Sequence, residues 1–306
     1  MTKHEFEEND MELEDIVSKY PPRLIMLIPL AIIALALIIL GATYLSTGSP
    51  VHLGIEFTGG TLITVPATES EDAVAAQFAG YPLADIRNIG SMYMMQFGPM
   101  SDQDYTALVR LVNSHYANSE IRYMGPIYSK ELQAQALKYL PLSFLLMAIV
   151  VFLVFREPIV SLLVVVSALA DILTAAASMD ITGVQLSLGT VAALLMLIGY
   201  SVDTDILLSM RVLKRKGAVE EKIIGAMGTG LMMTGTTIAA VLSLIVVSNL
   251  LYLVIPSFTR MDIIADISTV LIFGLAADIF NTWITNAQGL RWYMNRPKKA
   301  GRGHRK

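Results

Sequence analysis

The sequence LSLGTVAALLMLIGYSVDTDILLSM, residues 186–210, places two carboxylates, Asp203 and Asp205, in an otherwise apolar stretch. A helix needs about 20 apolar residues to span the hydrocarbon core of a bilayer, so this stretch predicts a membrane-spanning helix. An Asp at the centre of such a helix costs roughly 2.5–3.5 kcal/mol on insertion scales, and such residues usually face the interior of a helix bundle. We therefore expect the carboxylates of this helix to have a functional role.

Five further apolar runs have the length and composition of membrane spans. They are Leu24–Leu45, Leu140–Phe155, Ile159–Met179, Ile223–Val247 and Ile263–Ile284. Only 16% of the 306 residues are charged and the mean hydropathy is +0.59, whereas soluble domains average roughly 25% charged residues. The sequence Arg156-Glu157-Pro158 separates the second span from the third, because Pro lacks an amide donor and disfavours helix before it.

These spans predict an α-helical polytopic membrane protein with six transmembrane helices and one extracytoplasmic α+β domain between the first two. The expected parts are a cytoplasmic amino-terminal segment (1–23), the first helix (24–46), a soluble domain (47–136), a five-helix bundle (137–290) and a basic cytoplasmic tail (291–306). The first 23 residues are mixed polar and acidic, so we expect the first apolar run to be a retained span rather than a cleaved signal.

Positive charge in the short loops predicts the orientation. The connection 211–222 carries five Lys and Arg residues and the tail carries seven, whereas 180–185 has none and 248–261 has only Arg260. The positive-inside rule then puts both termini in the cytoplasm and the inserted domain outside, in a multi-pass protein of the cytoplasmic membrane. The basic tail either fixes the last helix or contacts anionic lipid headgroups or ribosomal RNA, and we favour the first reading. No nucleic acid substrate is expected.

The inserted domain reads as β-α-β-β-α-β, the ferredoxin-like order. We expect the first helix at Glu69–Phe78, opened by Thr68 and Glu71, and the second from Asp102 to Tyr116 with Ser101 as its N-cap. The expected strands are Gly60–Pro66, Ile86–Ile89, Met92–Phe97 and Glu120–Tyr128, with a turn at Gly90-Ser91. The domain shows no catalytic constellation, so a binding or coupling role is favoured for it.

Four carboxylates in the apolar runs are candidates for a proton relay: Asp171, Asp203, Asp205 and Asp278. At 100° per residue Asp203 and Asp205 point about 200° apart, so one faces the bundle interior and the other a neighbour or a polar cleft. Alternatively, they are buried structural hydrogen-bond partners. Thr234, Thr236 and Thr237 in the fifth run are expected either to bond a carboxylate on an adjacent helix or simply to pack.

The sequence lacks the residues that other kinds of functional site require. The chain has no cysteine, its four histidines are scattered, and no phosphate-cradling glycine loop is present, so neither metal nor cofactor is expected. An intramembrane aspartyl protease is not favoured, because its Gly-x-Gly-Asp signature is absent, and no enzymatic activity is expected.

Several segments resemble the archaeal SecF type of the SecD/SecF protein-export family, within the resistance-nodulation-division superfamily. Gly54-Ile55-Glu56-Phe57-Thr58-Gly59-Gly60-Thr61 resembles the family's motif after the first helix, with Glu in place of Asp. Gly125–Leu132 resembles the entry into the second helix, Gly199–Val202 the fourth-helix motif and Thr234–Thr237 the fifth-helix motif. The resemblance covers about residues 20–290.

The resemblance implies an auxiliary subunit that pairs with SecD in a twelve-helix bundle, acts on unfolded preproteins leaving a SecY-type translocon, and couples to proton movement. Bacterial members have one Asp after Asn in the fourth helix, whereas Asp203-Thr204-Asp205 straddles that position. We favour Asp203 as the titrating residue, with Asp278 and the threonines as companions. The alternative function is export of a lipid or small molecule, although such chains usually carry two large external domains and about twice as many helices.

Overall fold

The fold is described from a computed structural model, which covers residues 27–88, 92–116, 119–254 and 262–296; side chains are described except at 249–254 and 262. The predicted segment 1–23 and most of the predicted tail 291–306 lie outside these residues, as does the predicted Gly90-Ser91 turn. The chain divides into two compact units. The helical unit comprises residues up to 51, 143–184 and 189 onward, and the sheet unit comprises 52–142 and 185–188.

All six predicted spans are helices long and apolar enough to cross a membrane in the part of the chain that is described. The helices are α3 (Leu27–Thr47), α7 (Pro126–Phe155), α8 (Pro158–Thr182), α9 (Leu188–Lys214), α10 (Val219–Val254) and α11 (Asp262–Phe280). After α11 the helix continues without a break through a π-helical segment, η1 (Asn281–Asn286), into α12 (Ala287–Met294). These three segments together form one helical rod. The chain is therefore a multi-pass membrane protein, as its sequence predicts.

Helix α7 differs most from its predicted bounds, because it begins at Pro126 and not near residue 137. The stretch between Pro126 and Lys138 is too polar to read as a span, but it consists mostly of good helix formers and opens with Pro, whose missing N–H is not needed at the first helical position. The predicted break before α8 is confirmed: Pro158 starts that helix, and Arg156 before it has a positive φ of 57°.

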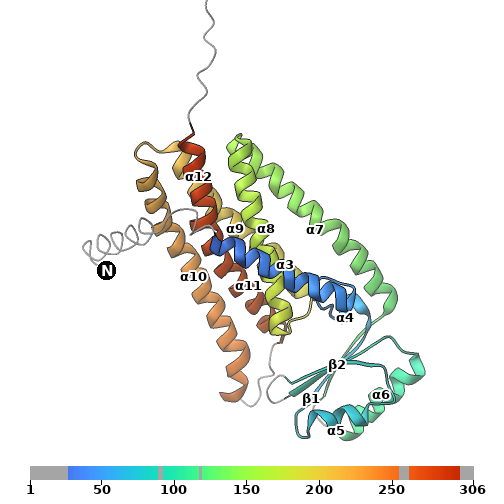
Figure 1. Cartoon of the computed structure of the whole chain (residues 1–306). Helices are drawn as coiled ribbons and strands as arrows, with labels where there is room; N and C mark the ends of the chain where they lie inside the picture. Colours follow the sequence, from blue (N-terminus) through green and yellow to red (C-terminus); the bar gives the residue numbers. More distant parts are fainter. Residues whose placement is uncertain (1–26, 89–91, 117–118, 255–261, 297–306) are drawn as a thin grey trace, which may run out of the picture. The chain divides into compact units, whose positions relative to one another are not determined.

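Burial divides the helical unit into a centre and a periphery. Helices α8, α9 and the α11–α12 rod are the most buried, whereas α7 and α10 expose most of their apolar side chains. In Figure 1, α8, α11 and α12 run beside one another. Exposed leucine, valine and phenylalanine side chains on α7 fit a lipid or helix neighbour, since a membrane-spanning helix need not hide apolar groups from water.

The sheet unit has the predicted ferredoxin-like order. Strands β1 (Gly60–Pro66), β2 (Leu83–Asn88), β3 (Met92–Phe97) and β4 (Glu120–Met124) form an antiparallel sheet in the order β2-β3-β1-β4. Helices α5 (Glu71–Gln77) and α6 (Asp102–His115) lie together on one face of the sheet (Figure 1). The core between them is apolar; it includes Ile63, Val74, Phe78, Met95, Phe97, Leu108 and Val112.

Two helix caps were predicted, and one is confirmed. The hydroxyl of Ser101 accepts a hydrogen bond from the Asp104 amide at 3.2 Å, as expected at the start of α6. The box predicted from Thr68 and Glu71 is wrong, because the N-cap of α5 is Ser70 and its side chain makes no capping bond. Strand β2 also begins before its predicted start, and the short helix α4 (Ile55–Thr58) was not predicted.

The turn between α4 and β1 consists of Gly59 and Gly60, and both have backbone conformations that favour glycine. Gly59 has a φ of 73° and Gly60 a φ of 114°. A Cβ on Gly60 would lie 2.0 Å from the carbonyl oxygen of Phe97, inside the sheet, and one on Gly59 would lie 3.2 Å from the Cα of Pro126. The turn therefore has no room for a side chain where β1 enters the sheet.

We expect Gly60→Ala to destabilise the sheet unit by at least roughly 1–3 kcal/mol, because it adds both backbone strain and a contact with a backbone oxygen. Gly80→Ala is the matched control, since its Cβ would meet nothing within 4 Å. Limited proteolysis of the full chain in detergent measures the effect. Equal cleavage rates within residues 60–124 for the two variants would contradict this account of the turn.

Candidate functional site

Three of the four predicted carboxylates lie together at the centre of the helical unit. Asp171 on α8, Asp205 on α9 and Asp278 on α11 are each 0% exposed. Burial of an ionised carboxylate is costly unless it is paired or hydrogen-bonded. The ion-pair and hydrogen-bond partners of these three groups therefore determine how they can be stabilised. No basic side chain forms an ion pair with any of them among the described residues; their partners are hydroxyl and amide groups.

Asp171 receives one donor on each oxygen. The Ser201 hydroxyl of α9 donates to Oδ2 at 2.5 Å, and the Asn281 amide of η1 donates to Oδ1 at 2.6 Å. The carboxyl group thus links α8 to two other helices of the centre.

Asp278 and Asp205 share a hydroxyl group. Thr204 Oγ1 lies 3.0 and 3.1 Å from the two oxygens of Asp278, and Thr282 Oγ1 lies 3.0 Å from Asp278 Oδ1. The same Thr282 Oγ1 lies 2.8 Å from Asp205 Oδ1, which also accepts from the Asn286 amide at 2.7 Å. Asp205 Oδ2 is buried and has no hydrogen-bond partner among the described residues.

Asp203 is placed differently from the expectation. Its side chain is exposed on α9, as are Gly199 and Tyr200 one turn earlier, while Ser201, Thr204 and Asp205 point inward. The two Asp residues do face different ways, as the helical period predicts. The residue that meets Asp278 through a shared hydroxyl is however Asp205, so the predicted companionship of Asp203 with Asp278 is corrected. A titrating role for Asp203 stays a prediction.

The predicted threonine partners do not reach the carboxylates. Thr236 and Thr237 donate to the Met233 carbonyl of their own helix at 2.8 and 3.0 Å, and Thr234 is buried without a hydrogen-bond partner among the described residues. The hydroxyl and amide groups that do contact the carboxylates were not predicted. Polar residues inside the last apolar run, Asn281 and Thr282, were the available signal, and Asn286 lies just beyond that run.

The second predicted group of residues, Glu56 to Gly60, lies in the sheet unit at a junction where several chain segments are hydrogen-bonded to one another. We call this junction the joint. Phe57 is buried and its carbonyl accepts from Gln133 of α7, while the Ile55 carbonyl accepts from the Ser129 hydroxyl at 3.3 Å. Glu56 is half-buried and Thr58 exposed. The motif thus fastens the beginning of α7 next to the turn at Gly59-Gly60.

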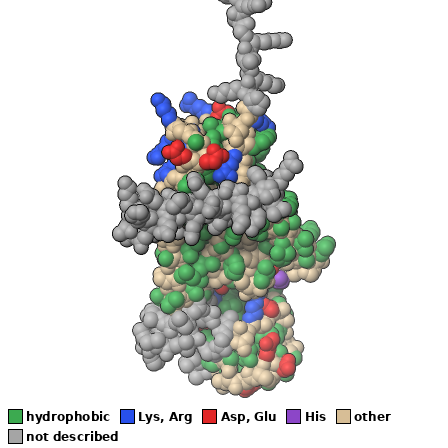
Figure 2. All heavy atoms as spheres, turned by 60° about the vertical axis from the view of Figure 1, so that its left-hand side comes forward, with side chains coloured by type: hydrophobic (Ala, Val, Ile, Leu, Met, Phe, Trp, Pro, Cys, Tyr) green, Lys and Arg blue, Asp and Glu red, His purple; other side chains and the backbone are tan. Residues whose placement is uncertain are grey.

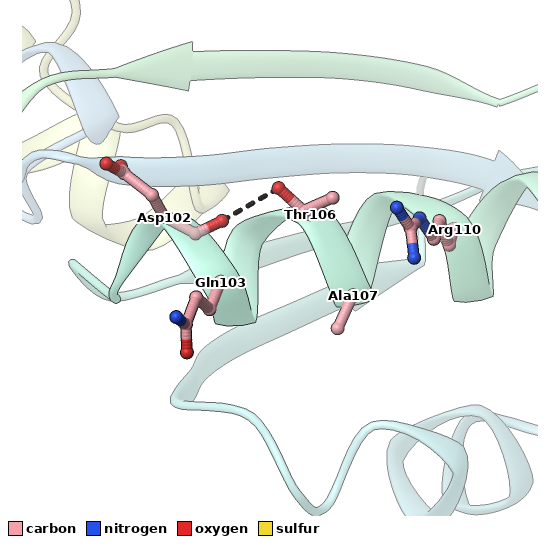
Figure 3. Close-up of a pocket in the computed structure, with 5 residues that line it drawn as sticks. All are labelled: Asp102, Gln103, Thr106, Ala107 and Arg110. Carbon is pink, nitrogen blue, oxygen red and sulfur yellow. Dashed lines mark hydrogen bonds between the residues drawn. The ribbon is translucent and has the colours of Figure 1, made fainter.

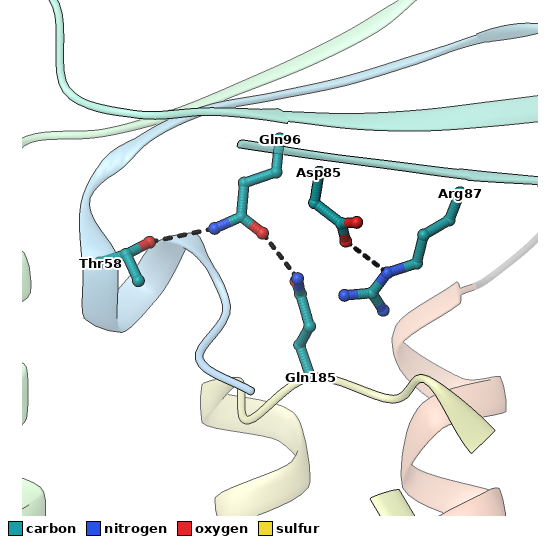
Figure 4. Close-up of polar contacts among 5 residues, drawn as sticks. All are labelled: Thr58, Asp85, Arg87, Gln96 and Gln185. Atoms are coloured by element: carbon teal, nitrogen blue, oxygen red, sulfur yellow. Dashed lines mark hydrogen bonds and ion pairs between the residues drawn. The ribbon is translucent and has the colours of Figure 1, made fainter. Parts of the chain in front are cut away.

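The connection between α8 and α9 is fastened to the same joint. Leu186 pairs with the segment before α4: its amide donates to the His52 carbonyl at 2.7 Å, and its carbonyl accepts from the Gly54 amide at 2.9 Å. Figure 4 shows the side-chain part of this contact, in which Gln185 donates to Gln96 at 2.6 Å and Gln96 donates to Thr58 at 3.2 Å. Since α9 begins at Leu188, the joint holds the chain directly before the helix that carries Asp205.

The surface of the sheet unit has an open depression of about 420 Å³ along α6. Figure 3 shows its lining, which comes from one face of that helix: Asp102, Gln103, Thr106, Ala107 and Arg110. The residues bring no catalytic set together. Within the described ranges no group of three or more His, Cys, Asp or Glu side chains is arranged to hold a metal ion.

Comparison with protein families identifies two segments. The family "Protein export membrane protein SecD/SecF, C-terminal" matches residues 104–296, and the "SecD/SecF GG Motif" matches residues 44–71, which include the Gly59-Gly60 turn.

Curated relatives match over nearly the whole chain. The protein-export membrane protein SecF of Methanolacinia petrolearia is 43% identical over 286 residues, which are 94% of this chain and 98% of the relative. The SecF proteins of Haloferax volcanii and Pyrococcus furiosus are each 38% identical; the matches cover 90% and 89% of this chain, and 94% and 91% of those relatives.

A solved structure shares the fold. The crystal structure of SecDF, a translocon-associated membrane protein from Thermus thermophilus, matches 90% of this chain with a TM-score of 0.74 at 20% identity. This chain spans 38% of the length of that one. With six apolar helices, a sheet unit after the first of them, and both family segments matched, the chain belongs to the SecD/SecF family of protein-export membrane proteins.

Proposed function

We propose that this chain is a non-enzymatic auxiliary subunit of protein export, in which Asp171, Asp205 and Asp278 take up and release protons as it works. Family membership supports the export role, because the relatives at 38–43% identity carry the name protein-export membrane protein. The buried carboxylate cluster supports the proton coupling. Intramembrane carboxylates that face a bundle interior are the usual elements of proton relays.

The observation that carries the proposal is the hydrogen-bonded row of carboxyl and hydroxyl groups from Asp205 through Thr282 to Asp278 and Thr204. A protonated carboxyl is a donor and an ionised one only an acceptor, so each proton gained or lost reverses the direction of some of these bonds. Because the groups belong to α9 and the α11–η1 rod, such a reversal changes what holds these helices together. Protonation can therefore be converted into helix movement.

The joint in the sheet unit supplies a route from the helices to the external domain. The α8–α9 connection is bonded to Gly54 and Gln96, and the beginning of α7 is bonded to Ile55 and Phe57. We propose that movement of α9 is passed to the sheet unit here, and that the sheet unit contacts an unfolded preprotein leaving a SecY-type translocon.

A SecD-type subunit is the partner that we propose in the membrane. The matched SecDF chain is longer than this one, and α10 exposes small and hydroxyl-bearing residues on one face, among them Gly228, Gly235 and Thr236. Small residues let helix backbones approach closely in a bilayer. Asp203 on the exposed face of α9 would also be shielded from lipid by such a neighbour.

We further propose the cytoplasmic membrane as the location, with both termini in the cytoplasm. Figure 2 shows Lys and Arg side chains gathered at one end of the helical unit. Lys214, Arg215 and Lys216 in the α9–α10 connection are exposed. The excess of basic residues in short loops marks the cytoplasmic side. Export of a lipid or small molecule, the alternative, is not favoured, since the curated relatives given above all carry the export name.

Asp205→Asn and Asp203→Asn form a matched pair, because both remove one carboxylate from α9 without changing its size. We expect Asp205→Asn to lower export of a secretory reporter about 100-fold, since a proton-transfer group typically contributes that much or more to a rate. Asp203→Asn should lower it far less. Export is measured in a strain depleted of the native subunit, with co-purification of the SecD-type partner as the control for assembly.

Normal export by Asp205→Asn would remove the proton-coupling part of the proposal. A loss confined to Asp203→Asn would assign the coupling to the exposed face of α9 instead of the buried cluster.

The chain has no cysteine, so single introduced cysteines report orientation without background. We expect Gln103→Cys, exposed on α6, to react with a membrane-impermeant maleimide in intact cells. Lys216→Cys, exposed between α9 and α10, should react only after the cells are permeabilised. The opposite labelling pattern would show that the proposed orientation is inverted.

A further inference from the structure

The π-helical segment η1 departs from the regular helix at the point where the carboxylates are contacted. Its sequence, NTWITN at 281–286, contains no Pro or Gly that would force the change. Asn281, Thr282, Trp283 and Asn286 are all buried. Single π-helical turns inside α-helices are rare and are found mostly at functional sites.

The wider turn brings the two asparagines to the same face. In an α-helix, with 3.6 residues per turn, Asn281 and Asn286 would point roughly 140° apart. In a π-helix the backbone bonds join residues five apart, which places such residues nearly above one another. Asn281 accordingly donates to Asp171 while Asn286 donates to Asp205, and Thr282 contacts both Asp205 and Asp278. A regular helix would not present all three to the carboxylates.

Packing on another side holds the segment in this form. Trp283 fills the space left by Gly230 of α10, where a Cβ would lie 2.2 Å from the Trp283 ring. Just after η1, Gly289 of α12 lies against Leu163 of α8, whose side chain would be 2.6 Å from a Cβ at that position. The rod is thus fitted closely to both neighbours, which limits its rotation.

Thr282 has one hydroxyl proton for two carboxyl groups, at 2.8 Å from Asp205 Oδ1 and 3.0 Å from Asp278 Oδ1. It can donate to one of them, and its oxygen can accept from the other only if that group is protonated. If Asp278 is the acid, its proton passes to Thr282 Oγ1 while the Thr282 proton passes to Asp205. One O–H bond is broken and one formed at each step, and the hydroxyl is regenerated.

In the part of the chain that is described, the titratable groups with hydrogen bonds to η1 are the three carboxyl groups. Asp171 faces it from α8, Asp205 from α9, and Asp278 precedes it on α11. From α10, Gly230 packs against Trp283, and α3 contains no acidic or basic residue. Among the described residues, Thr282 is therefore the hydroxyl that bonds to both Asp205 and Asp278.

We propose that Thr282 is the residue through which Asp205 and Asp278 exchange a proton, and that Asn281 and Asn286 are positioning residues, set on the same face by the π-helical turn. The inference rests on the proposed proton coupling and names the group that connects its two carboxylates.

Thr282→Val tests the exchange, because it keeps the shape of the side chain and removes its hydroxyl. Thr285→Val is the matched control: the same substitution in the same segment, at a hydroxyl that has no hydrogen-bond partner among the described residues. The measurement is proton uptake by vesicles that contain the full chain co-purified with its SecD-type partner. We expect uptake to fall about 100-fold in Thr282→Val and to be retained in Thr285→Val.

Thr282→Ser separates proton exchange from packing, since it restores the hydroxyl and not the methyl group. We expect it to recover most of the uptake. If Thr282→Val does not accumulate, Thr282→Cys, with its weak S–H donor, takes its place with the same expectation.

Equal uptake by Thr282→Val and Thr285→Val would overturn the inference, as would a Thr282→Ser variant as inactive as Thr282→Val. The proposed function fails separately. Full uptake by Asp205→Asn or Asp278→Asn would show that the carboxylates are not used, whereas loss in these variants with normal uptake in Thr282→Val would contradict only the role of Thr282.

Discussion

The helical unit is built around the cost of burying three carboxyl groups inside helices that are otherwise apolar. Asp171, Asp205 and Asp278 are fully buried, and each one obtains at least one donor from a helix other than its own. Such groups are tolerated in a low-dielectric interior only when their hydrogen bonds are made. The relative positions of α8, α9 and the α11–η1 rod are therefore fixed by polar contacts as well as by packing.

This arrangement also makes the centre sensitive to protonation. An apolar interface would keep its geometry at any pH, whereas a carboxyl group changes from donor to acceptor when it ionises. The shared Thr282 hydroxyl ties the state of Asp205 to that of Asp278, and Asn286 also bonds Asp205 to the π-helical turn.

In the sheet unit, the joint at Glu56–Gly60 connects chain segments in the same way that the carboxyl groups connect helices. It holds three chain segments that are distant in sequence: the segment before α4, the beginning of α7 and the α8–α9 connection. The tightness of the turn, where a Cβ on Gly60 would meet a backbone oxygen, explains the physical need for glycine in this motif.

The amino-acid sequence alone predicts the six spans, the single inserted domain and its β-α-β-β-α-β order, because hydrophobic length and period report directly on the solvent of each segment. It also shows that Asp203 and Asp205 must face opposite ways. The packing of the helices is what shows that Asp205 is the buried one, since either rotation of α9 satisfies the pattern. Only the tertiary structure shows that Asn281, Thr282 and Asn286 share a face, because the π-helical turn that aligns them breaks the period from which a sequence is interpreted.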